Sequence, residues 1–220
     1  MKKITLKQVL IPLITISIIL FLWFGPIYLG FLQLIISSIV VFIGSTIEYK
    51  GKWFSALGFQ REKLNFKNIF VYAPLVALGL FCFYIFILIP GVTKLTGVPI
   101  DYSFFKEITK DLKTFIISLI LILIGSGFGE EIIFRGYFMR QFLKFFGKSK
   151  ISIALSIVLI TAFFGFMHSG QGITGQIVTF VIGSLIALIF YLRKYDLWFV
   201  CSVHCFFNTI ALTSIYFGLA

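Results

Sequence analysis

Residues 115–143 read FIISLILILIGSGFGEEIIFRGYFMRQFL, a long apolar run interrupted by two adjacent glutamates and an arginine. A membrane-spanning helix needs about 20 mostly apolar residues, so this run is too long for one level span. It predicts either two helical pieces that meet at residues 125–127 or one tilted helix that emerges into the cytosol. Glu130, Glu131 and Arg135 need an explanation, because a charge at the bilayer centre costs about 2.5–3.5 kcal/mol.

The rest of the chain is also strongly apolar. Of its 220 residues, 60% are hydrophobic and 12% are charged, with a mean hydropathy of +1.07. A soluble domain is about 25% charged, so the composition predicts an all-α, polytopic transmembrane helix bundle in the lipid bilayer. The lysines and arginines that give the net charge of +11 lie between apolar spans, and no RNA or DNA motif is present. We therefore expect no nucleic-acid partner.

Apolar runs of spanning length predict seven membrane helices, or eight if the fourth run crosses twice. The expected spans are residues 8–24, 27–47, 68–90, 114–143, 151–168, 174–192 and 197–218. They form one transmembrane domain over residues 1–220, with a motif-bearing core at about 114–218. The basic start of the first span resembles a signal peptide, but its apolar run is too long and no small-residue cleavage site follows. We interpret it as an uncleaved span.

The distribution of lysine and arginine predicts the orientation in a cell (plasma) membrane. Fifteen of these residues fall in segments on the side of the N-terminus, and four fall on the other side, namely Lys94, Lys106, Lys110 and Lys113. The positive-inside rule then places the N-terminus in the cytoplasm and the C-terminus outside. Segment 48–67, basic and aromatic, is expected to be cytoplasmic with an interfacial amphipathic piece.

The two adjacent glutamates differ in their expected partners. Glu131 and Arg135 are four residues apart with the acid first, which is the favourable order for a helical ion pair. This pair is equally compatible with a structural clamp and with a chemical role. Glu130 projects roughly 100° away round the helix and has no evident partner on it.

Both histidines of the chain also lie in apolar segments. His168 follows Phe164 by four residues, so we expect the phenylalanine ring to lie against one side of the imidazole. His204 precedes Asn208 by four residues, so both share one helix face. Glu130 and His204 each lie about 15 Å along a helix from a basic boundary residue. His168 fits the same depth only if its helix starts below the membrane surface or tilts.

Three motifs, EExxxR (Glu130, Glu131, Arg135), FxxxH (Phe164, His168) and HxxxN (His204, Asn208), follow one another on successive spans. Together they resemble the CPBP family of intramembrane proteases, the CAAX-protease and bacteriocin-processing group also called Abi. The resemblance covers about residues 125–210. It implies that Glu130 and His168 hold the attacking water, that His204 and Asn208 bind the oxyanion, and that Glu131 with Arg135 supports them.

A metal-dependent mechanism is the alternative chemistry. His168, His204 and Glu130 could form a zinc site with open water, but the HExxH pattern of zinc proteases is absent, which favours a metal-free reaction. Cys201 and Cys205 share a helical stripe with His204 and could form a metal cluster. We expect all three cysteines, including Cys82, to be reduced packing residues.

Two other classes of function compete with a protease. Intramembrane Glu, His and Asn residues also serve transporters and proton relays, although no inverted repeat is evident. A non-catalytic membrane regulator or bacteriocin-immunity protein is the third class. For a protease, the substrates left open are a prenylated CAAX tail, a bacteriocin leader, a signalling peptide and another membrane protein.

Overall fold

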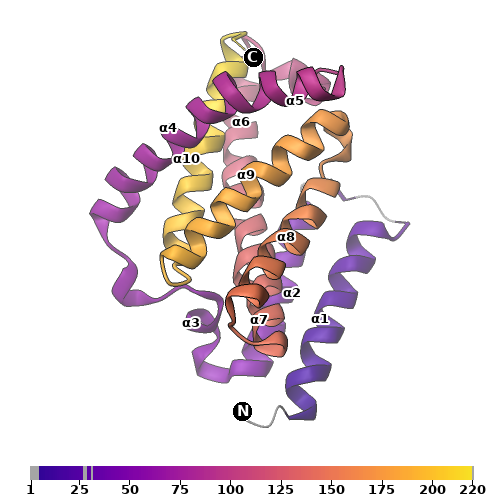
Figure 1. Cartoon of the computed structure of the whole chain (residues 1–220), viewed down its shortest axis with the longest axis vertical. Helices are drawn as coiled ribbons and strands as arrows, with labels where there is room; N and C mark the ends of the chain where they lie inside the picture. Colours follow the sequence, from indigo (N-terminus) through magenta and orange to yellow (C-terminus); the bar gives the residue numbers. More distant parts are fainter. Residues whose placement is uncertain (1–4, 27–28, 31, 220) are drawn as a thin grey trace.

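The structure, a computed structural model, describes residues 5–26, 29–30 and 32–219 and is helical, without strands, over that part of the chain. Figure 1 shows the helices packed as a bundle. The principal helices are α1 (Leu6–Phe24), α2 (Leu32–Tyr49), α3 (Trp53–Leu57), α4 (Ala73–Phe83), α5 (Ile89–Thr96), α6 (Leu112–Ile122), α7 (Arg140–Phe146), α8 (Lys150–Phe166), α9 (Gly172–Leu192) and α10 (Leu197–Tyr216).

Six helices in the described part of the chain are long and apolar enough to cross a membrane. They are Leu6–Phe24, Leu32–Lys63, Asn68–Thr96, Leu112–Phe146, Ser169–Leu192 and Leu197–Tyr216. The apolar helix α8 has 17 residues, or about 25 Å, at the lower end of the crossing range. The six spans and α8 each overlap one of the seven expected spans, although residues 27–28 and 31 of the second expected span lie outside the described residues. The polytopic helix bundle is confirmed.

The long run that contains the glutamates forms one continuous helix from Leu112 to Phe146. The expected alternative of two pieces meeting at residues 125–127 is therefore wrong. Between α6 and α7 the helix is wound as a π-helix, η6, over Leu123–Met139. Such wide turns are frequent at functional sites, and η6 contains all three ionisable residues of the run.

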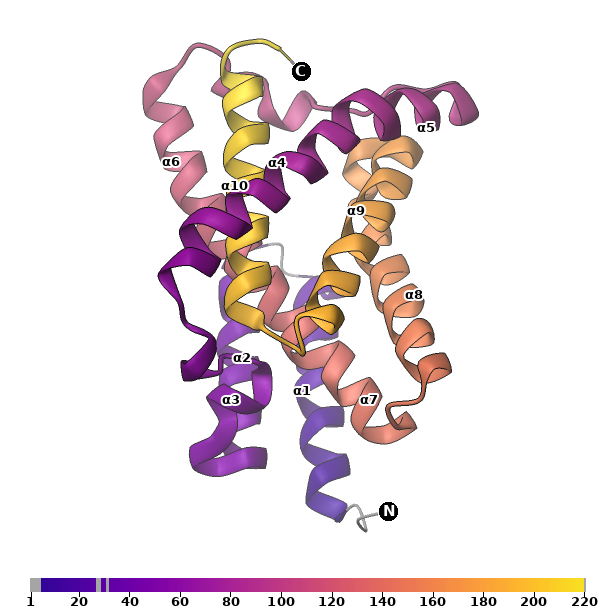
Figure 2. The same cartoon turned by 60° about the vertical axis from the view of Figure 1, so that its left-hand side comes forward.

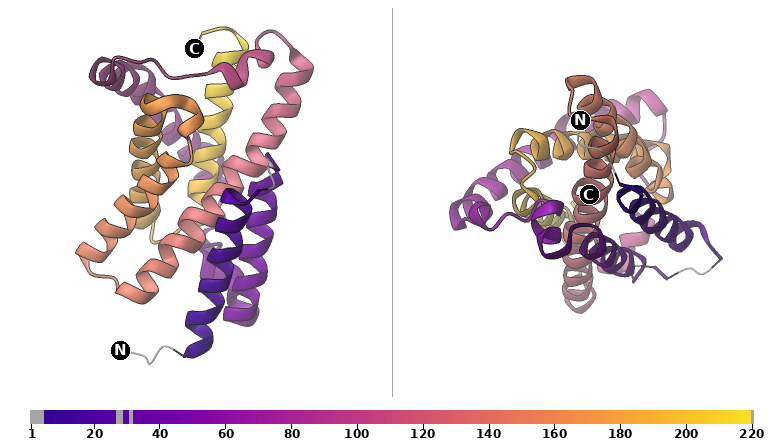
Figure 3. Two further views of the ribbon diagram at one scale, coloured as in Figure 1. Left: turned by 90° about the vertical axis from the view of Figure 1, so that its right-hand side faces the viewer. Right: turned by 90° about the horizontal axis from the view of Figure 1, so that it is seen from below.

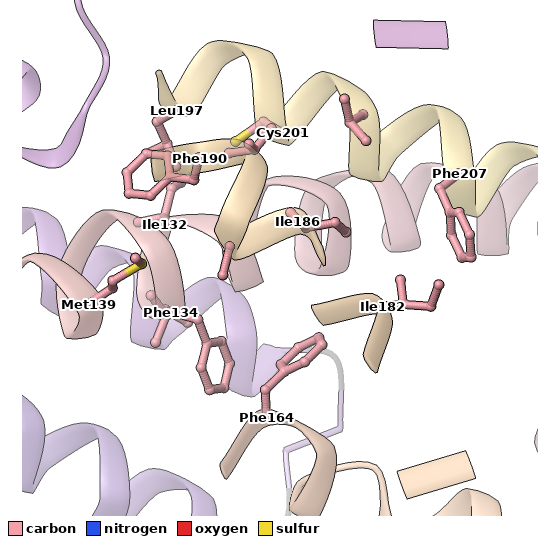
Figure 4. Close-up of a cluster of buried hydrophobic side chains, with 14 of the residues drawn as sticks. Ile132, Phe134, Met139, Phe164, Ile182, Ile186, Phe190, Leu197, Cys201 and Phe207 are labelled. Atoms are coloured by element: carbon pink, nitrogen blue, oxygen red, sulfur yellow. The ribbon is translucent and has the colours of Figure 1, made fainter. Parts of the chain in front are cut away.

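This long helix runs through the bundle from one end to the other (Figures 2 and 3). Helices α2, α8 and α10 pack against η6, while α9 packs mainly on α8. The cluster of buried apolar side chains in Figure 4 comes from these elements, with Phe134 of η6, Phe164 of α8, Ile186 of α9 and Cys201 of α10 among its members. The site helices therefore share one core.

The two ends of the bundle carry different segments. The start of α1, α3 and α7 lie at one end, and α5, the start of α6 and the end of α10 lie at the other (Figure 2). Arg135 is one of the fifteen basic residues that the positive-inside rule assigns to the cytoplasmic side, but it is buried inside the bundle with 1% exposure. Lys2 and Lys3 lie outside the described residues. Without them and Arg135, twelve basic residues lie at the α1–α3–α7 end and four at the other, so the charge asymmetry persists.

The segment expected to be cytoplasmic and amphipathic contains the short helix α3. Trp53 packs edge-on against Phe42 of α2, and Phe54 stacks on Phe59 with ring centroids 4.6 Å apart. Lys63 donates to the carbonyl oxygen of Lys194 at 2.6 Å. The segment is thus joined to the turn between α9 and α10.

Candidate active site

The ion pair expected within the long helix is present and is fully buried. Arg135 Nη1 donates to Glu131 Oε1 at 2.9 Å, with the two side chains 1% and 0% exposed. Arg135 Nη2 donates to the carbonyl oxygen of Gly183 on α9 at 2.7 Å, and its guanidinium lies 4.9 Å from the centre of the Phe164 ring. A buried charge is tolerated when it is paired and hydrogen-bonded, and this pair also joins η6 to α8 and α9.

Glu131 has a second partner that the sequence did not indicate. Its Oε1 lies 2.8 Å from Nδ1 of His204 on α10. Because this oxygen also accepts from Arg135, the Nδ1 atom is the one that donates. The contact fixes the imidazole so that Nε2 faces Glu130, 3.9 Å from Oε2.

Glu130 is buried and incompletely hydrogen-bonded. Its side chain is 9% exposed, and Oε2 has no hydrogen-bond partner among the described residues. The 3.9 Å separation from His204 Nε2 is longer than a hydrogen bond. As the helical spacing predicts, Glu130 does not share the arginine. It leaves a carboxylate oxygen free for another molecule.

His168 lies just beyond the end of α8, on the short turn that leads to α9. Its Nδ1 lies 2.8 Å from the carbonyl oxygen of Phe164, and the two rings meet edge to face with centroids 4.7 Å apart. A carbonyl oxygen only accepts, so Nδ1 carries the hydrogen and Nε2 of the neutral ring is an acceptor. The expected wall of Phe164 beside His168 is confirmed.

Asn208 follows His204 by one turn of α10 and reaches η6. Its Nδ2 donates to Ser126 Oγ at 3.2 Å. This contact uses one of the two hydrogens on Nδ2 and leaves the other to a ligand. Sequence reasoning treated Ser126 only as part of a glycine-rich break; its polarity inside an apolar run was the available signal.

The four residues expected to be catalytic line one cavity of about 650 Å³, together with Ser126. A second cavity of about 360 Å³ lies beside it and is also lined by Glu130 and His168. Phe164 lines both cavities, whereas Glu131 and Arg135 line neither of them. The structure therefore brings Glu130, His168, His204 and Asn208 together from three separate segments.

A zinc site requires three or more ligands that converge on one point. Over the described ranges, no group of three or more His, Cys, Asp and Glu residues could hold a metal ion. Glu131 engages Nδ1 of His204 and the Phe164 carbonyl oxygen engages Nδ1 of His168, so only Nε2 of each ring is open to a ligand. Cys205 Sγ faces the carbonyl oxygen of Leu123 at 3.9 Å. As placed, His168, His204 and Glu130 do not form such a group.

The fold and the site together define the class of the protein. It is a multi-pass helical membrane protein with a cavity lined by two histidines, a glutamate and an asparagine. Residues 112–210 match the family model described as type II CAAX prenyl endopeptidase Rce1-like, and this match confirms the expected resemblance to the CPBP family over the segment that carries every motif residue. No curated protein and no solved structure matches the chain. The matched segment is thus similar to CAAX-type intramembrane proteases.

Proposed function

We propose that the chain is an intramembrane endopeptidase that hydrolyses peptide bonds with a water molecule activated by Glu130 and His168. The observation that carries this proposal is the free Oε2 of buried Glu130 in a cavity shared with His168, His204 and Asn208. Peptide hydrolysis needs a base for water and donors for the oxyanion. The cavity lining supplies both kinds of group.

In this reaction Glu130 removes a proton from the water while Nε2 of His168 accepts a hydrogen bond from it. The oxygen then attacks the carbonyl carbon, and the carbonyl oxygen becomes an oxyanion. Glu130 passes its proton to the leaving nitrogen as the C–N bond breaks. Water is consumed, and one carboxyl and one amino group are formed.

The oxyanion is stabilised by the free N–H of Asn208 and by His204. Since Nδ1 of His204 already donates to Glu131, donation from Nε2 requires the imidazolium form, in which both nitrogens carry hydrogen. The Glu131 carboxylate is then its counter-ion, and Arg135 shares that carboxylate. Glu131 and Arg135 thus act as positioning residues through His204.

Comparison of membrane peptidomes from cells that express the wild type or Glu130→Gln tests this function and searches for the substrate. We expect one or more fragments that depend on the wild type, from a bacteriocin leader, a signalling peptide or another membrane protein. Indistinguishable peptidomes at equal expression would contradict the proposal and favour a transporter, a proton relay or a non-catalytic regulator.

A further inference from the structure

A group of basic side chains, away from both cavities, surrounds Tyr195 in the turn between α9 and α10. The guanidinium of Arg140 lies 5.4 Å from the centre of the Tyr195 ring, and the ammonium nitrogen of Lys148 lies 5.6 Å from it. Lys63 donates to the carbonyl oxygen of Lys194 at 2.6 Å and interacts electrostatically with the side chains of Arg140 and Lys194. Four cations from three segments of the chain therefore gather at one turn.

The side chain of Arg140 has no acceptor for its hydrogens. It is half-buried and makes no hydrogen bond or ion pair with the described residues, and none of its nitrogen atoms is fully buried. Nearby carboxyl groups do not serve it, because Glu48 pairs with Lys144 and Asp196 caps α10. A guanidinium binds carboxylate and phosphate oxygens in pairs. An external anion would supply the acceptors that are missing here.

The turn that carries Tyr195 is held in an uncommon backbone conformation. Lys194 and Tyr195 are consecutive residues other than glycine with positive φ, at 54° and 62°. Such residues persist in the left-handed region only where surrounding contacts hold them. Here the Lys63 ammonium binds the Lys194 carbonyl oxygen, and the Tyr195 N–H donates to the carbonyl oxygen of Phe190 at 2.7 Å. The turn is thus a fixed platform, which lowers the entropic cost of binding a ligand.

The basic group lies at the depth of lipid headgroups. Arg140 is near the end of the long helix, and Tyr195 lies between two spans, both at the α1–α3–α7 end of the bundle (Figure 2). Basic pockets between membrane helices at such a boundary bind the phosphates of anionic lipids. Phe146 and Ile151, on either side of Lys148 in the sequence, are 67% and 73% exposed and offer apolar contacts to acyl chains. These neighbours favour a lipid over a free anion.

We propose that Arg140, Lys148, Lys63 and Tyr195 form a binding site for the phosphate of an anionic lipid. Arg140 donates to two phosphate oxygens, and the two lysine ammonium groups compensate the remaining charge. The bound phosphate joins the end of η6 to the turn from which α10 begins, and these two elements meet again in the candidate active site. The lipid therefore stabilises their relative position. Its binding is independent of the proposed cleavage reaction.

The site is tested by thermal unfolding of the purified full chain in a neutral detergent, titrated with phosphatidylglycerol, phosphatidylcholine or inorganic phosphate. We expect only phosphatidylglycerol to raise the unfolding midpoint of the wild type. In Arg140→Gln/Lys148→Gln, its half-maximal concentration should rise about tenfold or more, because charge-assisted hydrogen bonds are lost. The matched variant Lys52→Gln/Lys67→Gln removes two exposed charges at the same end and should respond like the wild type.

Three results would overturn the assignment. An equal response of the two double variants would show a general effect of surface charge. An equal effect of inorganic phosphate would identify a free anion as the ligand, and an equal effect of phosphatidylcholine would show that no anionic headgroup is recognised. Lys148→Gln alone, at an exposed position, keeps the test decisive if the double variant does not fold, since it should also weaken the response to phosphatidylglycerol.

Discussion

At the scale of single residues, Glu130 and Glu131 show how neighbouring carboxylates take different roles. Glu131 Oε1 accepts from both Arg135 and His204, so its charge is compensated. Oε2 of Glu130 has no such partner within the described chain, and the residue lines the cavity. The difference arises because consecutive residues project to different sides of η6, one toward α10 and the arginine, the other toward the cavity.

Asn208 and Ser126 provide a residue-scale prediction. Asn208→Ala removes an oxyanion donor and should lower the cleavage rate by about 10²–10³-fold with substrate binding little altered. Ser126→Ala removes only the acceptor that orients Asn208, a hydrogen bond worth about 1 kcal/mol, and should cost about fivefold. Rates and dissociation constants of purified variants measure both effects. Loss of stability with unchanged activity per folded molecule in Asn208→Ala would identify a packing residue instead.

The metal question also belongs to this scale. Because no described trio of ligands is in place, we expect cleavage to survive exhaustive chelation and purified protein to lack stoichiometric zinc. Metal analysis and activity measured before and after chelation test this expectation. Reversible loss of activity that zinc restores would establish a metalloprotease with ligands drawn from Glu130, His168 and His204.

At the scale of elements, the approach of η6 to α10 depends on Gly127. A Cβ at this position would clash with Sγ of Cys205, and small residues allow such close packing between membrane helices. Gly127→Ala should therefore destabilise the protein by about 1–3 kcal/mol and displace His204 and Asn208. Thermal unfolding and activity measure the two consequences.

Matched variants separate this close contact from a general effect of alanine. A Cβ at Gly79 of α4 meets nothing within 4 Å, so Gly79→Ala should be neutral or stabilise by up to about 1 kcal/mol. Cys205→Ala removes the clashing sulfur and should restore much of the loss in the double variant. Equal behaviour of Gly127→Ala and Gly79→Ala would show that the contact does not limit packing.

The start of α10 gives another prediction at this scale. Asp196 caps the helix, because its Oδ1 accepts from the Phe199 N–H at 3.2 Å, while burial raises the pKa of Asp196. Because the pKa of Asp196 is higher in the folded than in the unfolded protein, folding favours the protonated carboxyl group. The free energy of unfolding therefore decreases as the pH rises from the ordinary carboxyl pKa toward the raised one. Asp196→Asn should keep the cap and lose that pH dependence, whereas Asp196→Ala should cost about 1 kcal/mol. The free energy of unfolding, measured at two pH values, distinguishes the Asn variant from the Ala variant. An Asp196→Ala variant as stable as the wild type would contradict the capping role.

At the scale of the whole molecule, the apolar spans and the motif residues could be predicted because both depend on local composition and spacing. The spans follow from hydropathy, and the four cavity residues follow from polar groups inside apolar runs.

The π-winding of η6 could not be predicted, because its glycine-rich stretch is equally compatible with a break. The contacts of Glu131 with His204 and of Asn208 with Ser126 join residues 73 and 82 positions apart, and helical spacing predicts neighbours only along one helix. Arg135 was assigned to a cytoplasmic segment for the same reason, since its burial depends on α8 and α9.

The most direct test of the account is cleavage of a verified substrate by purified Glu130→Gln, with Glu131→Gln and Glu107→Gln in parallel. General-base catalysis contributes about 10²–10⁴-fold, so Glu130→Gln should lose at least that factor while it remains folded and inserted. Glu131→Gln should lose stability as well as activity, because Arg135 and His204 lose their shared acceptor. Glu107→Gln, at an exposed position outside the site, should match the wild type. Equal cleavage by Glu130→Gln and wild type would contradict the assignment of Glu130 as the base.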